Sequence, residues 1–440
     1  MDPLGHLAII WASVLVATWL SERTRMTPVL WYLFMGAALV NLGWLPEAPQ
    51  GFIERFSELG IIVIMFALGF EEDVGRFLKT AQRSWGIALF GALAPFAMAW
   101  GLALWWFGDP RIALMCGLAM TATAVSLTMV SLRSEGLQHS PAATGIMASA
   151  VLDDLASLAL VALLVPLVVS AQPVSLGSEL WALTKALTFF GLVLALSVWV
   201  IPHDLGASRA RRLPFIGRYG IRHLIQIGEG MQASLVMLLL AMSLALIGQA
   251  LGFHPAVGAY LAGLILREEY FHVRDRPSRE LYLRTKHVID DVAFTWIGPV
   301  FFVTLGARLV FEGELLAAVL APAIGLYLGL MFAQVLSAGL AARYTGGFDW
   351  ADSVMIGFGM LGRAELAFVV MGIAYVQYPI LSPEAFYTLM LSAFLLNWSV
   401  PVLIRWWKPW CTGARELPAW MRERQGHGAD DPPAPPAGSG

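Results

Sequence analysis

Residues 148–159 read ASAVLDDLASLA, with two adjacent carboxylates, Asp153 and Asp154, near the middle of an apolar run. No other charged residue occurs between Pro141 and Val169, and this run is long enough for a helix that crosses a bilayer. An ionised aspartate at the bilayer centre costs about 2.5 to 3.5 kcal/mol on insertion scales, so an adjacent pair needs a reason. We interpret the pair as a site that holds and releases a cation or a proton.

The two aspartates are expected to have unequal roles. Successive residues of an α-helix point about 100° apart, so one should be the principal ligand and its neighbour a modulator. A purely structural pair at a helix end, or one paired with basic groups, is the alternative. The apolar flanks and the absence of Lys or Arg from residues 141–169 weigh against that alternative.

The composition predicts an all-α polytopic membrane protein. Of 440 residues, 58% are hydrophobic and 13% are charged, whereas soluble domains carry about 25% charged residues. Two cysteines, Cys116 and Cys411, give neither a disulfide framework nor metal-ligand spacing. The first apolar run follows Met1 without a positive segment or a cleavage site, so we interpret it as a retained helix and not a signal peptide.

Apolar runs separated by polar or basic breaks predict about 13 transmembrane helices. The predicted spans are residues 4–21, 27–45, 58–70, 84–107, 111–131, 141–169, 179–201, 222–251, 254–267, 287–307, 314–342, 352–377 and 384–405. Spans 58–70 and 254–267 are short, so they are expected to borrow flanking residues or to be broken or tilted.

The basic residues predict the orientation. When alternate loops are assigned to one side, 23 of the 28 Lys and Arg residues fall there, and only Arg55, Arg111 and Arg308 fall on the other side. Lys185 and Arg363 lie inside spans. By the positive-inside rule, the N-terminus is outside and the C-terminus is cytoplasmic, in the inner (plasma) membrane of the cell.

The spacing of the spans predicts two inverted six-helix repeats joined by a linker helix at 179–201, because a long basic segment follows the middle span. Polar interruptions at 120–128 and 357–365 fall at corresponding positions of the two halves. Residues 411–440 are predicted to be a disordered cytoplasmic tail, since they are polar and rich in proline. They show no strand, Gly-rich loop and helix typical of a nucleotide-binding regulatory domain.

The interruptions supply further candidate ligands. Thr121 and Thr123 offer hydroxyls and freed carbonyls, although hydroxyls that bond back to their own helix are an equally good interpretation. Arg363 and Glu365 need partners, either each other or a half-helix end, and we favour a supporting role for both. Asp290 and Asp291 lie near a predicted interface, where solvated caps are the preferred interpretation.

Several motifs occur in an order that resembles the monovalent cation/proton antiporter superfamily. They are TATAV at 121–125, Gly136, ASAVLDD at 148–154, HPAVGAYLAGLILR at 254–267, FFVTLG at 301–306 and the segment 359–368. The chain is most similar to the branch with paired aspartates and to Kef-type potassium efflux relatives, over residues 5 to 405.

The resemblance implies a homodimer with a moving core domain that contains two crossed broken helices. The transmembrane domain would cover 1–410, with the core at 84–169 and 287–405 and the dimerisation helices at 4–70 and 222–267. By position, Asp154 matches the indispensable carboxylate of the family for Na⁺ or K⁺ and for the proton, and Asp153 matches its partner. Thr123 matches the first crossover, and Arg363 with Glu365 matches the second.

One position departs from the family pattern. Electrogenic members carry a lysine where Gln334 stands, and glutamine can form hydrogen bonds but cannot carry a proton. The resemblance and this departure together predict an exchange of one proton per cation that moves no net charge.

The expected function is secondary active exchange of Na⁺ or K⁺ for protons by alternating access, with no enzymatic activity, no cofactor and no nucleic-acid partner. A Kef-like potassium efflux pathway is one alternative, weakened by the lack of a regulatory domain. A proton-coupled organic solute carrier is another. It would need aromatic groups converging near the aspartates, and the 17 tryptophans are better explained as interfacial anchors.

Overall fold

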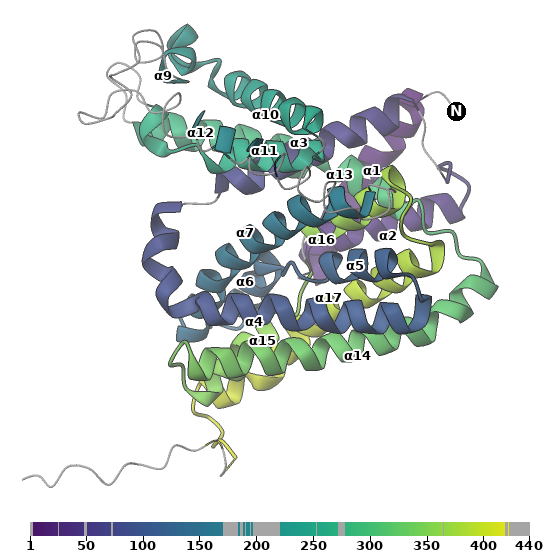
Figure 1. The fold of residues 1–440 in the computed structure, drawn as a ribbon, viewed down its shortest axis with the longest axis vertical. Coiled ribbons are helices and arrows are strands. Elements are labelled where there is room, and N and C mark those ends of the chain that lie inside the picture. The colour runs from purple at the N-terminus through teal and green to yellow at the C-terminus, as the bar shows by residue number, and fades with distance from the viewer. Residues whose placement is uncertain are drawn as a thin grey trace, which may run out of the picture.

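The computed structural model describes residues 3–24, 26–47, 51–71, 74–169, 221–251, 253–271, 278–363, 365–418 and 421, with isolated positions between 184 and 196. These residues form helices and loops, and no strand occurs among them. Figure 1 shows α4 and α14 side by side along one edge of the molecule, with α9 to α12 gathered at the far end.

The helical elements coincide with every predicted span except 179–201. That span lies almost entirely outside the described residues, as does most of the predicted tail. In chain order the elements are α1 (Pro3–Thr24), α2 (Pro28–Asn41), α3 (Phe52–Glu71), α4 (Val74–Phe107), α5 (Pro110–Ala119), α6 (Val125–Ser134), α7 (Pro141–Val169), α9 (Ile221–Ile225), η4 (Ile227–Gly230), α10 (Ala233–Ala250), α11 (Pro255–Leu264), η5 (Glu268–Phe271), α12 (Ser278–Asp291), η6 (Val292–Trp296), α13 (Gly298–Gly306), α14 (Gly313–Tyr344), α15 (Trp350–Gly359), α16 (Glu365–Gly372), η7 (Ile373–Gln377) and α17 (Pro383–Cys411).

Within the described part of the chain, 6 helical segments are long and apolar enough to cross a membrane. They are Pro3–Thr24, Ser84–Phe107, Ala233–Ala250, Arg279–Gly306, Gly313–Tyr344 and Pro383–Cys411. The short span 58–70 borrows flanking residues as expected, because α3 begins at Phe52 and has 20 residues. Span 254–267 stays short, since α11 has 10 residues. The total of 13 crossings stays a prediction.

The span predicted at 287–307 begins earlier than expected. The helix α12 begins at Ser278 and continues through a π-helical turn, η6, into α13. Asp290 and Asp291 lie at the end of α12. The Asp290 carboxylate lies 4.0 Å from Lys286, and the Asp291 carboxylate lies 3.7 Å from His287, each one turn earlier in the helix. The cap interpretation is wrong for Asp291, whose side chain makes no cap hydrogen bond, and stays a prediction for Asp290. Apolar runs do not mark this start, because the first turns of α12 are charged.

The extensive helix packing falls into two groups. The scaffold group contains α1 to α3 and α9 to α13, and the core group contains α4 to α7 and α14 to α17. Among the described elements, every pair with extensive contact lies within one group, and only weaker contacts join the two. The molecule is therefore built from two helical bodies that face one another.

Small residues allow close approach within the scaffold group. A Cβ atom on Gly69 of α3 would lie 2.1 Å from the carbonyl oxygen of Tyr260 in α11. On the other helix, a Cβ atom on Gly263 would lie 2.3 Å from the carbonyl oxygen of Phe66. Glycine at these positions lets α3 and α11 pack backbone against backbone, as is common between membrane helices.

Candidate functional site

Two interrupted helices meet inside the core group. The first break separates α5 from α6 over residues 120–124, and the second separates α15 from α16 over residues 360–364. Both coincide with the interruptions predicted from the sequence. The backbone N–H of Ala124 donates to the carbonyl of Gly362 at 2.9 Å, and the Thr128 hydroxyl donates to the carbonyl of Gly359. The freed backbone groups of one break are thus partly satisfied by the other.

Asp153 reaches the first break from the middle of α7. Its side chain is fully buried, and its Oδ2 accepts from the Thr123 hydroxyl at 2.7 Å and from the Thr123 backbone N–H at 3.2 Å. The other oxygen, Oδ1, is buried and has no hydrogen-bond partner. Asp154 lies on the same helix, but its side chain is outside what the structure describes.

Arg363 lies at the second break, where α15 ends, with only 1% of its surface exposed. One terminal nitrogen donates to Gln334 Oε1 at 3.1 Å, and the other lies 3.4 Å from the carbonyl oxygen of Met360 and 3.3 Å from that of Gly362. A cation beside carbonyls at the C-terminal end of a helix is favoured by the helix dipole. Arg363 also attracts Asp153 electrostatically, although no direct ion pair joins these two described side chains.

Glu365 occupies the opposite kind of position, as the first residue of α16. A carboxylate at the N-terminal end of a helix is stabilised by the dipole and by free N–H groups. Each of the two charges predicted to need a partner is therefore found at a half-helix end, one of the two arrangements considered from the sequence.

Of the remaining predicted residues, Gln334 supports Arg363 and Thr121 does not contact the carboxylate. Gln334 of α14 is fully buried and donates to the carbonyl of Gly91 in α4 at 3.0 Å, besides accepting from Arg363. The Thr121 hydroxyl donates to the carbonyl of Gly117 at 2.8 Å within its own helix. In this arrangement Thr121 is back-bonded, and Thr123 is the threonine that contacts the carboxylate.

Asn397 of α17 was missed in the sequence analysis. It is fully buried, its Oδ1 accepts from the backbone N–H of Arg363 at 2.7 Å, and its Nδ2 donates to the Arg363 carbonyl at 3.0 Å. The signal available from the sequence was a single amide within the apolar span 384–405. This side chain replaces hydrogen bonds that an unbroken helix would have given to residue 363.

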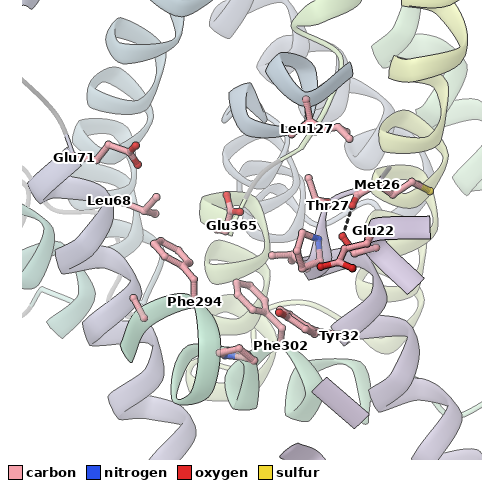
Figure 2. A pocket seen from close by; sticks show the side chains of 16 residues that line it. Glu22, Met26, Thr27, Tyr32, Leu68, Glu71, Leu127, Phe294, Phe302 and Glu365 are labelled. Carbon is pink, nitrogen blue, oxygen red and sulfur yellow. Dashed lines mark hydrogen bonds between the residues drawn. The ribbon is translucent and has the colours of Figure 1, made fainter. Parts of the chain in front are cut away.

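Among the residues that the structure describes, two hollows lie where the scaffold and core groups face one another. The first has a volume of about 540 Å³ and contains Glu365 from the core group, with Glu22 and Glu71 from the scaffold group. Figure 2 shows the Glu365 carboxylate between those two acidic side chains, above Phe294, Phe302 and Tyr32. The second, of about 350 Å³, is bordered by Glu54, Glu58 and Arg308 of the scaffold side and by the end of η7.

A hydrogen bond between two side chains connects the groups beside the second hollow. His254 Nε2, at the start of α11, bonds to Gln377 Oε1 at the end of η7. Gln377 also lines the second hollow. This contact lies at the end of the interface away from Glu365.

The protein-family model described as "Sodium/hydrogen exchanger, transmembrane" matches residues 11–407. The chain belongs to this exchanger family. Members of the family are transporters and not enzymes, which agrees with the absence of enzymatic activity expected from the sequence. The membership also supports a multi-pass membrane protein.

The chain is similar to several proteins that are named antiporters or potassium-efflux systems. The chain is 24% identical to the Na(+)/H(+)-K(+) antiporter GerN of Bacillus cereus, over 91% of this chain and 95% of GerN. It is 22% identical to a Na(+)/H(+) antiporter of Enterococcus hirae, over 92% and 97%. It is 26% identical to the glutathione-regulated potassium-efflux system protein KefC of Escherichia coli O7:K1, over 88% of this chain and 57% of KefC.

A solved structure has the same fold. The sodium proton antiporter MjNhaP1 of Methanocaldococcus jannaschii superposes with a TM-score of 0.65 at 15% identity, over 92% of this chain and 97% of that chain. Together with the family match and the antiporter relatives, this fold confirms the resemblance to the monovalent cation/proton antiporter superfamily that the short motifs indicated.

Proposed function

We propose that this protein exchanges Na⁺ or K⁺ for protons, with cation and proton competing for Asp153 and Asp154. The observation that carries the proposal is the buried Asp153 carboxylate at the junction of two helix breaks, with one oxygen unpartnered. A bare carboxylate there is costly, so it gains most when a cation or a proton neutralises it. Thr123 and the carbonyls of the breaks complete a shell of oxygen ligands.

Alternating access follows from the two helical bodies. We infer that the core group moves against the scaffold group, that the two interrupted helices are the crossed pair of an inverted repeat, and that the hollows are the two access routes. By the Lys and Arg distribution, the hollow with Glu365 opens to the cytoplasm and the one with Arg308 to the outside. Dimerisation is assigned to the scaffold group.

The packing refines the proposed domain boundaries. Helix α13 packs against α1, α2 and α3, so we assign residues 278–306 to the scaffold and begin the second core segment at α14. The first core segment, 84–169, is kept. The linker helix at 179–201 stays a prediction.

The main test is Asp154→Asn in proteoliposomes. We expect this change to abolish cation-dependent proton movement, because the neutral amide cannot exchange a proton for a cation. The measurement is quenching of a pH-sensitive dye on addition of each alkali chloride in turn. Glu314→Gln, an exposed position at the start of α14, is the control and should transport normally. Retained exchange in Asp154→Asn would remove this residue from the central role.

The stoichiometry is tested separately. Because Gln334 cannot carry a proton, we predict an exchange of one proton per cation that moves no net charge. With the membrane potential clamped by potassium and valinomycin, and Na⁺ as the exchanged cation, the rate should not change between 0 and −100 mV. A rate that follows the potential would contradict electroneutrality and leave the exchange itself intact.

The relation to KefC keeps a potassium efflux pathway as a second candidate. Potassium flux without any counter-movement of protons, or single-channel conductance in a planar bilayer, would favour that candidate over exchange.

A further inference from the structure

Ser157 lies one helical turn after Asp153 on α7, with 1% of its surface exposed. Its hydroxyl oxygen is buried and has no hydrogen-bond partner. The Oδ1 oxygen of Asp153 is buried and unpartnered too. Two orphaned oxygens therefore occur on one face of one helix, at a spacing of i and i+4.

An unpartnered serine hydroxyl inside a helix is unusual, since the carbonyl four residues earlier normally accepts from it. Two buried serines of the core group follow this rule. Ser131 donates to the carbonyl of Leu127 at 2.8 Å, and Ser149 donates to that of Gly145 at 2.9 Å. Ser157 departs from the pattern, and leaving such a group buried without a partner is destabilising.

The i and i+4 positions of Asp153 and Ser157 on α7 suit a ligand between their side chains. Side chains at i and i+4 have Cβ atoms about 5 to 6 Å apart, which leaves room for one small ion or water between short polar groups. The two groups do not bond each other, because both are unpartnered. Both are acceptors when the carboxylate is ionised, so the occupant that satisfies both must be a cation or a donor.

The positive charge of Arg363 does not occupy Asp153 Oδ1, so this oxygen is available to a ligand. Arg363 attracts Asp153, yet its terminal nitrogens are directed to Gln334 and to the carbonyls of the second break. Thr123 holds only Oδ2. Within the described part of the chain, Asp153 Oδ1 therefore accepts no hydrogen bond.

We propose that Ser157 Oγ is a further ligand of the transported monovalent cation, which it holds together with Asp153 Oδ1. This inference rests on the proposed exchange function and names a residue that tunes cation affinity. It requires that removal of the hydroxyl weaken cation binding without preventing the movement of the core group.

Two measurements on the full-length protein test the proposal. The first is the rise in apparent Tm in detergent as NaCl or KCl is titrated against choline chloride at constant ionic strength. The second is the KM for the cation in proteoliposomes. For Ser157→Ala we expect about a tenfold weaker apparent affinity in both, with kcat unchanged, because a hydrogen-bond-scale contact to a charged group is lost. Ser157→Thr keeps the hydroxyl and should restore most of the affinity.

Ser131→Ala is the matched control, since it removes a buried hydroxyl that its own helix already satisfies. Its cation affinity should equal that of the unmodified protein. The proposal is overturned if Ser157→Ala lowers the Tm without salt but leaves the cation affinity unchanged, which is the result expected for a structural water.

The design separates this inference from the function on which it rests. If cations raise the Tm in a Ser157-dependent manner while no cation-dependent proton movement is found, exchange fails and the ligand assignment stands. If exchange is present and its KM is insensitive to Ser157→Ala, the ligand assignment fails alone. If no cation raises the Tm of the unmodified protein and none drives proton movement, both fail.

Discussion

At the residue scale, Thr123 gives Asp153 two donors, its hydroxyl and its backbone N–H. Thr123→Val keeps the shape and the N–H but removes the hydroxyl, so one carboxylate oxygen loses a donor in a buried site. Hydrogen bonds to charged groups contribute about 1.5 to 3 kcal/mol, so the ionised form that binds the cation is disfavoured. We expect the KM for the cation to rise by about tenfold or more.

Thr121→Val is the control for that prediction. The Thr121 hydroxyl donates to the carbonyl of Gly117 within its own helix, so the same chemical change should leave the KM within about twofold. Dye quenching in proteoliposomes at several cation concentrations gives both values. Equal KM values for the two variants would show that the Thr123 hydroxyl does not support the site.

A site residue could be predicted where its own type and its apolar surroundings single it out, and not where its role depends on a contact formed by the fold. Asp153, Thr123 and Arg363 were found because charges and hydroxyls in apolar runs are visible in one sequence. The choice between Thr121 and Thr123 was not available, since it depends on which hydroxyl its own helix already satisfies. Asn397 was missed because its role depends on a contact 34 residues away in the sequence.

At the element scale, the approach of α3 to α11 depends on glycine. A methyl group on Gly69 would lie 2.1 Å from the carbonyl oxygen of Tyr260, and backbone cannot move aside as a flexible side chain can. We expect Gly69→Ala to lower the free energy of unfolding by about 1 to 3 kcal/mol through overpacking. The measurement is the apparent Tm in detergent.

Gly101 of α4 provides the comparison. A Cβ atom there meets nothing within 4 Å, so Gly101→Ala gains helix propensity without a clash. Its Tm should stay the same or rise. A Tm for Gly69→Ala that matches that of Gly101→Ala would mean that α3 and α11 separate at little cost.

Helix boundaries show what apolar runs can and cannot predict. The two breaks were placed correctly because Gly, Thr and charged residues interrupt otherwise apolar spans. The start of α12 was misplaced because its first turns are charged, so its helix begins where hydropathy gives no signal. Apolar runs do not predict which helices pack together. We therefore assign α13, which was expected in the core, to the scaffold because of its packing.

At the scale of the whole molecule, the His254 to Gln377 hydrogen bond joins two bodies that are proposed to move against each other. We predict that the double variant His254→Cys and Gln377→Cys, with Cys116 and Cys411 replaced by Ala, loses exchange under oxidising conditions. A disulfide there would fix the core group against the scaffold group. Reduction should restore the rate.

The pair Glu135→Cys and Lys408→Cys is the matched control. These residues form an ion pair of 3.0 Å within the core group, so a cross-link there should not restrain the proposed motion. Gel mobility after cleavage at an engineered site confirms that each disulfide has formed. Full exchange in the oxidised His254 and Gln377 pair would contradict relative movement at this position.

The amide of Asn397 forms hydrogen bonds with both backbone groups of Arg363 and thereby fixes the backbone of the second break. In the exchange proposed above, an arriving ion would meet backbone that is already arranged, and no helix would need to unwind for it to enter. Affinity in such a preorganised site is set by the balance between the free energy that dehydration of the ion costs and the free energy gained from the protein oxygens that replace its water. Discrimination among alkali ions would then arise from their hydration and not from a rearrangement of the protein.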